Sequence, residues 1–276
     1  MFEIPEVTTL AAQINGHMTG KIISEGMLGN SPHKFVWYNR THEEFAQLTQ
    51  GKTVGSAIPR GRWLCISIDP GYVLVLGECG GKVLLHPAGS SLPAKYHLAL
   101  RFTDNTLFTS TTQMWGAMEL YETGKELNRQ YIKNMRITPD SREFTLSYFN
   151  GMIDELIKGE KRSVKSLLTQ DQIIPGLGNA IAQDIMFNAR LHPRHPLKEL
   201  YPDQREMLYH AIVDTVKAVI AAGGRNDETD LFDNPGGYRR IMDADAVNRP
   251  CPECGGNILK MQYLGGSCYF CPRCQL

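Results

Sequence analysis

Residues 251–274 read CPECGGNILKMQYLGGSCYFCPRC and carry the strongest structural signal in the chain. Cys251 and Cys254 form one Cys-x-x-Cys motif, and after sixteen residues Cys271 and Cys274 form a second. Each motif supplies two thiolates from one tight turn, and two such turns complete a tetrahedral zinc site. Because protein ligands fill all four positions, we expect one structural zinc ion rather than a catalytic one.

Two short apolar runs lie between the cysteine pairs and are separated by the turn Gly265-Gly266. This pattern predicts a β-hairpin that carries the two metal-binding turns. Cys268 is left over and is expected to point away from the metal. A zinc hairpin alone does not distinguish a DNA partner from an RNA or protein partner.

The composition is that of an ordinary globular protein, with 276 residues, 42% hydrophobic and 21% charged. No apolar run is long enough to span a membrane, and the N-terminus has no signal pattern. We therefore expect a cytoplasmic protein, associated with the nucleoid if it is bacterial. Lys and Arg number 29, as do Asp and Glu, which argues mildly against nucleic acid but does not exclude a local basic face.

The order of patterns predicts an α+β, multi-domain chain. Short apolar runs and turn signals between residues 21 and 122 predict an N-terminal antiparallel β-sandwich or barrel, after a short helix over residues 9–19. Helical periodicity dominates from about residue 146 to 222. The expected domains are 1–125 (β-sandwich), 126–145 (linker), 146–245 (helical domain) and 246–276 (zinc finger).

Residues 165–179 read KSLLTQDQIIPGLGN and join two predicted helices through a glycine-rich turn. Gly176 and Gly178 permit backbone conformations closed to other residues and let another molecule approach closely. Asn179 lies where the next helix begins, and the free amides there favour a phosphate. An ordinary helical hairpin in which Asn179 caps the helix fits the same residues.

Three separated segments together resemble the formamidopyrimidine-DNA glycosylase/endonuclease VIII family. MFEIPEV at the N-terminus resembles its N-terminal motif MPELPEV, and IPGLGNAIAQDIMFNARLHP resembles its helix–two-turn–helix signature. The tail CPECGG to CYFCPRCQ resembles its C-terminal zinc finger. The resemblance runs from residue 3 to residue 275 in the order and spacing of the family.

This resemblance implies a β-sandwich, a helix–two-turn–helix domain and a zinc hairpin that bind double-stranded DNA containing a damaged base or an abasic site. It implies base excision with a flipped lesion, attack of the N-terminal amine on the sugar C1′, and strand cleavage by elimination. A monomer with no membrane association is expected. Glu3 aligns with the family's catalytic acid and Glu6 with its second acidic residue, while Lys165 and Asn179 align with residues that hold phosphates.

The position of the nucleophile departs from the family pattern. The family has Pro at position 2, exposed when the initiator methionine is removed, whereas this chain has Phe2. Methionine aminopeptidases require a small second residue, so Met1 is expected to stay and to carry the free amine. That amine can form an imine, but it lies one residue away from the family's register, and misplacing a reacting group by about 1 Å costs about a hundredfold in rate.

Other departures fall on residues that contact DNA in the family. The catalytic lysine of the sandwich aligns with Arg62, which keeps the charge but cannot act as a base. The methionine that fills the gap left by the flipped base aligns near Glu78. The wedge aligns with residues 113–115, where Met114 and Trp115 could still enter a base stack.

The phosphate-binding arginine of the family's zinc hairpin aligns with Gly266, and Lys260 or Arg273 could compensate for it. The glycine-rich loop 223–238 lies where the family places a lesion-covering loop, and a solvated connector fits it equally well.

Three functions fit these residues. The first is an active glycosylase for oxidised bases, with or without abasic-site lyase activity, in which Met1 or a water activated by Glu3 attacks the sugar. The second is a catalytically impaired protein that binds damaged DNA on the same scaffold. The third is an RNA- or ribosome-associated zinc protein. The retained Glu3, Lys165 and Asn179 favour the first. The absence of the family's proline, wedge arginine and zinc-hairpin arginine favours the second.

Overall fold

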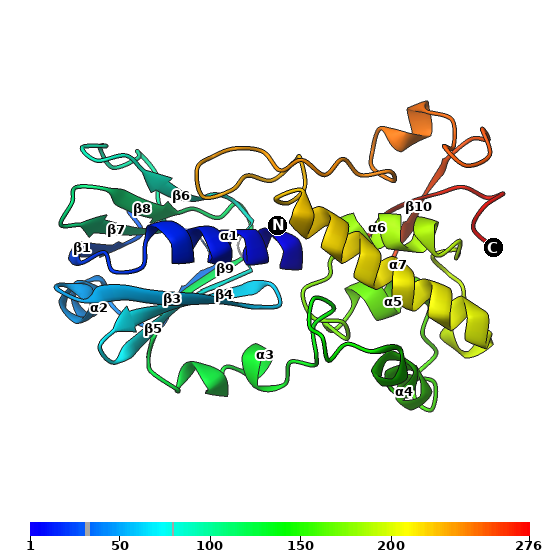
Figure 1. Cartoon of the computed structure of the whole chain (residues 1–276), viewed down its shortest axis with the longest axis horizontal. Coiled ribbons are helices and arrows are strands. Elements are labelled where there is room, and N and C mark those ends of the chain that lie inside the picture. The colour runs from blue at the N-terminus through cyan, green and yellow to red at the C-terminus, as the bar shows by residue number, and fades with distance from the viewer. Residues whose placement is uncertain (31–33, 79) are drawn as a thin grey trace. The chain divides into compact units, whose positions relative to one another are not determined.

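The computed structural model describes residues 1–30, 34–78 and 80–276, and these form two compact units. Residues 1–135 and 222–237 make up the first, here called the strand unit. Residues 136–221 and 238–276 make up the second, here called the helical unit. The chain therefore enters the strand unit twice (Figure 1).

Two β-sheets form the strand unit, one of four strands in the order β1-β7-β8-β6 and one of five in the order β2-β9-β5-β4-β3. The strands are β1 (Ile23–Leu28), β2 (Val36–Tyr38), β3 (Thr53–Arg60), β4 (Trp63–Asp69), β5 (Tyr72–Gly77), β6 (Val83–His86), β7 (Leu98–Phe102), β8 (Leu107–Ser110) and β9 (Gly116–Glu122). Neighbouring strands pair antiparallel except β2 and β9, which pair parallel. The predicted antiparallel β-sandwich is confirmed, with this one parallel edge.

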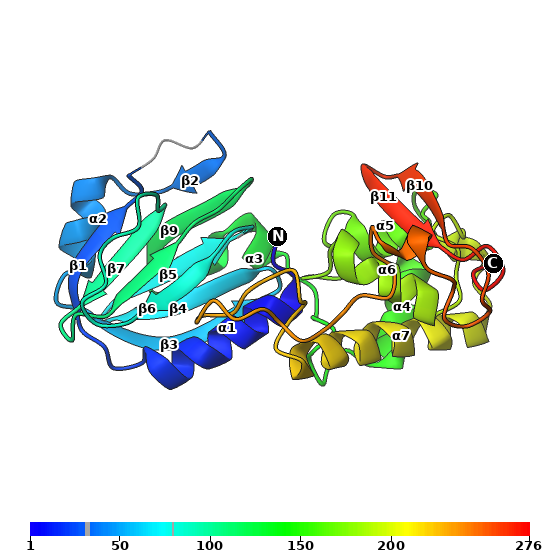
Figure 2. The same ribbon diagram turned by 90° about the horizontal axis from the view of Figure 1, so that it is seen from above.

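A single apolar core joins the two sheets to the first helix, α1 (Ile4–His17). Leu10 of α1, Ile66 of β4 and Phe108 of β8 all belong to it. The helix packs against β3 and β4 (Figure 2). Phe2 is 1% exposed and lies in the same core, so its side chain anchors the N-terminus to the sheet layers.

The first helix begins five residues earlier than the 9–19 expected from its apolar spacing, because its start is set by polar and backbone effects. Pro5 lies in the first turn, where a missing N–H costs nothing because that N–H has no intrahelical partner. The Glu6 carboxylate accepts a hydrogen bond from the Glu3 backbone N–H at 2.9 Å. The apolar pattern therefore located the helix but not its beginning.

The smaller helical elements of the strand unit are α2, α3 and a 3-10 turn, η1. Their bounds are α2 (His42–Thr49), η1 (Glu126–Asn128) and α3 (Gln130–Lys133). Thr41 and Glu44 form a capping box at the start of α2, a signal that is present in the sequence as Thr-x-x-Glu. The elements η1 and α3 lie in the segment 126–145, which was expected to be an irregular linker.

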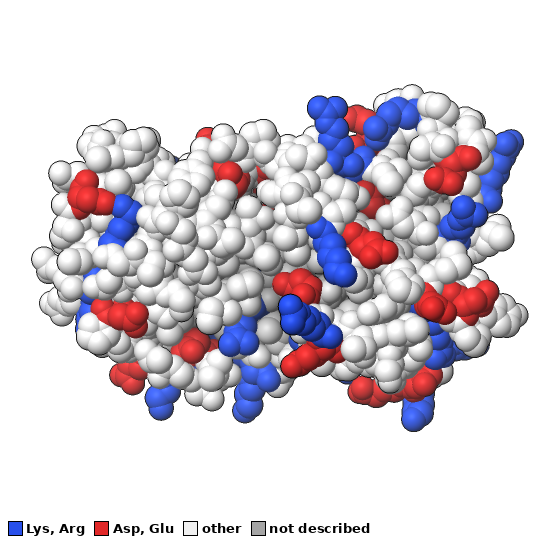
Figure 3. Space-filling model, viewed as in Figure 1, with Lys and Arg blue, Asp and Glu red and all other residues white. Residues whose placement is uncertain are grey.

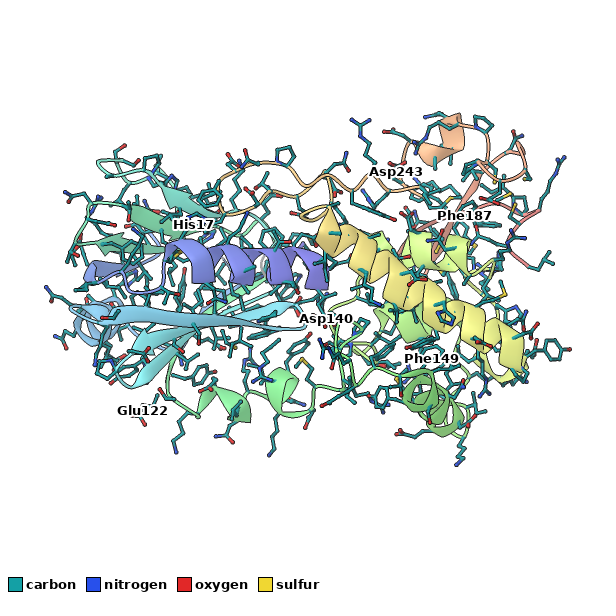
Figure 4. All side chains as sticks on the ribbon, in the orientation of Figure 1. His17, Glu122, Asp140, Phe149, Phe187 and Asp243 are labelled. Carbon is teal, nitrogen blue, oxygen red and sulfur yellow. The ribbon has the colours of Figure 1, made fainter. Side chains whose placement is uncertain are left out.

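The helical unit contains helices over the segment where helical periodicity was expected, followed by the predicted hairpin. Its elements are α4 (Leu146–Leu156), α5 (Val164–Thr169), α6 (Asn179–Asn188), η2 (Leu197–Glu199), α7 (Pro202–Ala221), η3 (Ala246–Asn248), β10 (Leu259–Tyr263) and β11 (Gly266–Phe270). Phe149 of α4 is fully buried, and Phe187 of α6 packs among the apolar residues around the hairpin (Figure 4). No helix in the described ranges is long and apolar enough to cross a membrane.

A buried carboxylate fastens the segment after residue 237 to α6. Asp184 is fully buried and accepts hydrogen bonds from the Tyr238 hydroxyl at 2.9 Å and from the Met242 backbone N–H at 2.8 Å. The backbone N–H of Ile241 donates to the same carboxylate. This contact fixes the path of the chain into the cysteine-rich tail.

The segment 222–237 packs with the strand unit rather than with the helices on either side of it in sequence. Leu231 is fully buried in the core, and its carbonyl accepts a hydrogen bond from the Leu85 N–H at 2.8 Å. The Gln13 side chain accepts from the Leu231 N–H at 2.9 Å. The expected domain 146–245 would place this segment with the helices, because sequence order alone gives no sign of the return.

Candidate functional site

The first residues of the chain and the loop 222–237 are joined by a buried ion pair. Glu6 and Arg225 are each 3% exposed at the side chain, and Arg225 Nε lies 3.0 Å from Glu6 Oε1. Arg225 Nη2 donates to the other carboxylate oxygen of Glu6 at 3.2 Å. The backbone N–H of Arg225 also donates to Glu6 Oε1 at 3.0 Å. One carboxylate therefore fixes both the side chain and the backbone of the loop.

Arg225 stays charged in this buried position. Burial alone would lower its pKa, but the carboxylates of Glu6 and Glu3 outweigh burial and raise the pKa above its ordinary range. Gly224, just before it, has φ +103°, and a Cβ there would touch the Glu6 side chain at 3.4 Å. Only glycine adopts this conformation readily, so it lets the loop turn close to Glu6.

The same arginine reaches the N-terminal residue. Arg225 Nη2 donates to the Met1 carbonyl at 2.9 Å. The Met1 α-amine donates to Glu228 Oε1 at 2.7 Å, and Glu228 is 14% exposed at its side chain. The loop thus holds the first residue at both its carbonyl and its amine. Glu3 is 4% exposed, and its charge contributes to the field around Arg225.

Two departures from the family pattern contact each other beside Met1. Arg62 Nη2 and Glu78 Oε1 lie 3.0 Å apart, with both side chains less than a quarter exposed. Arg62 Nη1 also lies 3.4 Å from Met1 Sδ. The charge of Arg62 is therefore matched by Glu78, near which the methionine of the family is expected to align.

In the helical unit, Lys165 is buried against the hairpin formed by β10 and β11. It is 1% exposed, and its Nζ donates to the Tyr263 carbonyl at 2.6 Å and lies 3.4 Å from the Gly266 carbonyl. The ammonium thus binds carbonyl oxygens on both sides of the hairpin turn. In this arrangement Lys165 orients the hairpin, and its role toward phosphate stays a prediction.

Asn179 lies exposed at the first position of α6, and its Nδ2 donates to the Ser267 carbonyl at 3.2 Å. Gln183, one turn further, donates to the same carbonyl at 2.7 Å. A Cβ at Gly266 would lie 3.4 Å from the Asn179 side chain. The hairpin therefore packs closely over the start of α6 at Gly266, the residue expected to align with an arginine of the family.

The glycine-rich turn before α6 needs a glycine conformation at one of its two glycines. Gly176 has φ +86°, in the region that favours glycine, whereas Gly178 is extended, a conformation that any residue adopts. The Gln172 side chain accepts from the Gly176 N–H at 2.9 Å and donates to the Leu177 carbonyl at 3.1 Å. This side chain closes the turn, a role that sequence reasoning missed.

Met114 and Trp115 are 59% and 42% exposed, as the predicted wedge requires. Trp115 is not isolated, because its ring contacts Phe35 at 4.6 Å and stacks on Trp37 at 5.3 Å between centroids. The wedge residue is thus supported by a small aromatic cluster that includes β2.

The four predicted metal ligands come together in the tail. The sulfur atoms of Cys251, Cys254, Cys271 and Cys274 all lie within 4.8 Å of one another. The Cys254 and Cys271 sulfurs are 3.5 Å apart, and those of Cys251 and Cys274 are 3.8 Å apart. Four thiolates held about 2.3 Å from a tetrahedral ion lie about 3.8 Å apart, so the donor set fits one metal ion. Cys268 is buried outside this set.

Charges of both signs are interspersed on the surface. On the face drawn in Figure 3, Lys and Arg side chains lie among Asp and Glu side chains, without a continuous field of either sign. This agrees with the equal totals of 29. On this face, a polyanion would therefore meet individual basic side chains and not a broad basic field.

Comparisons with known proteins agree with the resemblance. The chain matches the formamidopyrimidine-DNA glycosylase N-terminal domain over residues 1–118 and the formamidopyrimidine-DNA glycosylase H2TH domain over residues 137–230. It is 30% identical to the formamidopyrimidine-DNA glycosylase of Bacillus licheniformis over 284 residues, which cover 100% of this chain and 99% of that protein. The enzyme of the same name from Lactobacillus delbrueckii subsp. bulgaricus is 28% identical with the same coverage.

Solved structures share the fold. A complex of Lactococcus lactis Fpg with DNA containing an abasic site has a TM-score of 0.84 at 22% identity and covers 99% of both chains. A structure of MutM with DNA containing carbocyclic 8-oxo-G has the same TM-score, identity and coverage. At this identity the likeness establishes the fold.

The buried pair of Glu6 and Arg225 generates a stability prediction. Arg225→Met should lower the free energy of unfolding by about 3–5 kcal/mol, because it leaves the Glu6 carboxylate buried without its partner. Urea denaturation measures this loss. Arg249→Met is the matched control, since Arg249 is half-exposed and pairs with Asp243 at the surface, where ion pairs contribute about 0–1 kcal/mol. Equal losses in the two variants would show that the pair does not hold the loop.

Proposed function

The chain belongs to the formamidopyrimidine-DNA glycosylase family, and from this premise we propose that it is a base-excision repair glycosylase that acts on double-stranded DNA containing oxidised bases or abasic sites. The observation that carries this proposal is the site around Met1. The Met1 α-amine, two buried carboxylates and the glycine-containing loop 222–237 meet there in the strand unit. Amine and acid are the groups that imine-forming base excision needs.

In the proposed reaction Glu3 is the general acid. It protonates the leaving base or the sugar oxygen as the C1′–N bond breaks. Glu6 acts through Arg225 and orients the residues around the amine. The Met1 amine is the attacking group for imine formation, and Arg62 contributes charge beside it without acting as a base.

The proposed DNA contacts in the helical unit are Lys165, Asn179, Gly176 and Gly178. Asn179 is exposed at the start of α6, and the positive end of a helix favours a phosphate there. Lys165 supports this surface by holding the hairpin turn. Met114 and Trp115 of the strand unit would enter the base stack at the lesion.

We also propose that the four-cysteine cluster binds zinc. Four thiolates leave no open coordination position, so the ion would hold the hairpin together and take no part in the reaction. The chain is expected to work in the cytoplasm, at the nucleoid if its source is bacterial.

Catalysis and mere binding are distinguished by one assay. Duplexes with an abasic site, 8-oxoguanine or dihydrothymine are incubated with the protein and base release is measured. Glu3→Gln should slow release by about 10²–10⁴-fold, because an amide cannot donate the proton. Glu122→Gln, at an exposed position at the end of β9 (Figure 4), is the control and should release base at the rate of the unchanged protein.

Two outcomes would contradict parts of this proposal. Tight binding to these duplexes with no base released from any of them would leave a damaged-DNA-binding protein. Base release that Glu3→Gln does not slow would keep the glycosylase but remove Glu3 from its proposed role.

The proposed zinc site is tested by measuring the metal content of the protein. Elemental analysis of the purified protein should find about one zinc per chain, and Cys271→Ser should lose it, because a hydroxyl replaces a thiolate ligand. Cys268→Ser is the matched control and should retain zinc, since Cys268 lies outside the cluster. Equal zinc loss in both variants, or a protein that holds no metal, would refute the assignment.

A further inference from the structure

The Met1 amine is held by a residue that the family resemblance does not assign. Its hydrogen bond at 2.7 Å goes to Glu228, which comes from the loop 222–237 and not from the N-terminal motif. Glu228 also lies 3.4 Å from Arg225 Nη2. It is therefore placed between the buried ion pair and the amine.

We propose that Glu228 positions the Met1 α-amine and accepts its proton when the amine attacks C1′ of the damaged nucleotide. This inference rests on the proposed glycosylase function and names the group that activates the displaced nucleophile. An ammonium has no lone pair, so it must lose a proton before or during attack. A carboxylate within hydrogen-bond distance can receive that proton.

The other charged groups around Met1 already have other contacts or roles. Both oxygens of Glu6 accept hydrogen bonds, from Arg225 and from the Glu3 backbone. Arg62 is paired with Glu78 and cannot accept a proton. Glu3 is assigned to the leaving group. Of the carboxylates described around the N-terminus, Glu228 is the one whose oxygen is placed against the amine nitrogen.

The surroundings also restrict where the amine can point. The Met1 carbonyl is fixed by Arg225, and the Phe2 side chain is buried in the core. Gly80 lies on another side, where a Cβ would be 3.4 Å from Met1 Cα and 3.8 Å from its nitrogen. With the carbonyl and the next side chain fixed, Glu228 sets the remaining direction of the amine. Holding the amine in one orientation offsets part of the rate lost because the nucleophile lies one residue away from its position in the family.

The proposed step is balanced. The nitrogen lone pair forms the N–C1′ bond as the C1′–base bond breaks, and the bonding pair leaves with the base, which takes a proton from Glu3. The amine passes one proton to Glu228. The adduct nitrogen then carries two protons. It gives one of them up to O4′ as the C1′–O4′ bond breaks, and borohydride reduces the protonated imine that remains to a stable amine.

Glu228→Gln tests this role, because glutamine keeps a hydrogen-bond acceptor but cannot take the proton. On a duplex with an abasic site, its rate of borohydride trapping near pH 7 should fall about 100-fold. Raising the pH should recover part of the rate, since bulk deprotonation then replaces the missing acceptor. Glu228→Asp should retain more activity than Glu228→Gln, and DNA affinity should stay within about twofold in both.

Asp233→Asn is the matched control, because it removes one charge from the same loop at an exposed site paired with Lys82. It should trap at the rate of the unchanged protein. Trapping by Glu228→Gln at an unchanged or higher rate, with an unchanged pH profile, would overturn the inference. So would base release by the unchanged protein without any trapping, although the glycosylase function would then stand. A protein that neither traps nor releases base would overturn both.

Discussion

The buried ion pair between Glu6 and Arg225 determines how the chain's beginning is presented. It joins residues 219 positions apart, at a site where each side chain is 3% exposed. An isolated charge there would be strongly unfavourable, so each partner requires the other. Because Arg225 also binds the Met1 carbonyl and brings Glu228 to the amine, one pair fixes the N-terminus and the loop together.

Phe2 changes the chemistry of the N-terminus through packing. Its ring occupies the core, so position 2 serves as an anchor, and the proposed reactive nitrogen is that of Met1. The pairing of Arg62 with Glu78 beside Met1 is part of the same rearrangement. These substitutions look like separate losses in the sequence. In the structure they surround one amine and leave it with a carboxylate partner.

Local patterns predicted much of the fold and little of this network. The cysteine spacing and the glycine turn are short-range signals, and they located the four-cysteine cluster and the helix–turn–helix segment. The start of α1 was missed because Glu3, Pro5 and Glu6 set it without apolar periodicity. Arg225 and Glu228 were missed because their partners are more than 200 residues away, and a polar, glycine-rich loop resembles a solvated connector.

The attachment point of reduced DNA tests directly whether the Met1 amine is the reacting group. After borohydride reduction on an abasic-site duplex, nuclease and protease digestion followed by peptide mass mapping identifies the modified nitrogen. The structure predicts that the sugar remnant is on the α-nitrogen of an intact Met1. A remnant on a lysine side chain, or on the nitrogen of Phe2 after loss of Met1, would contradict it.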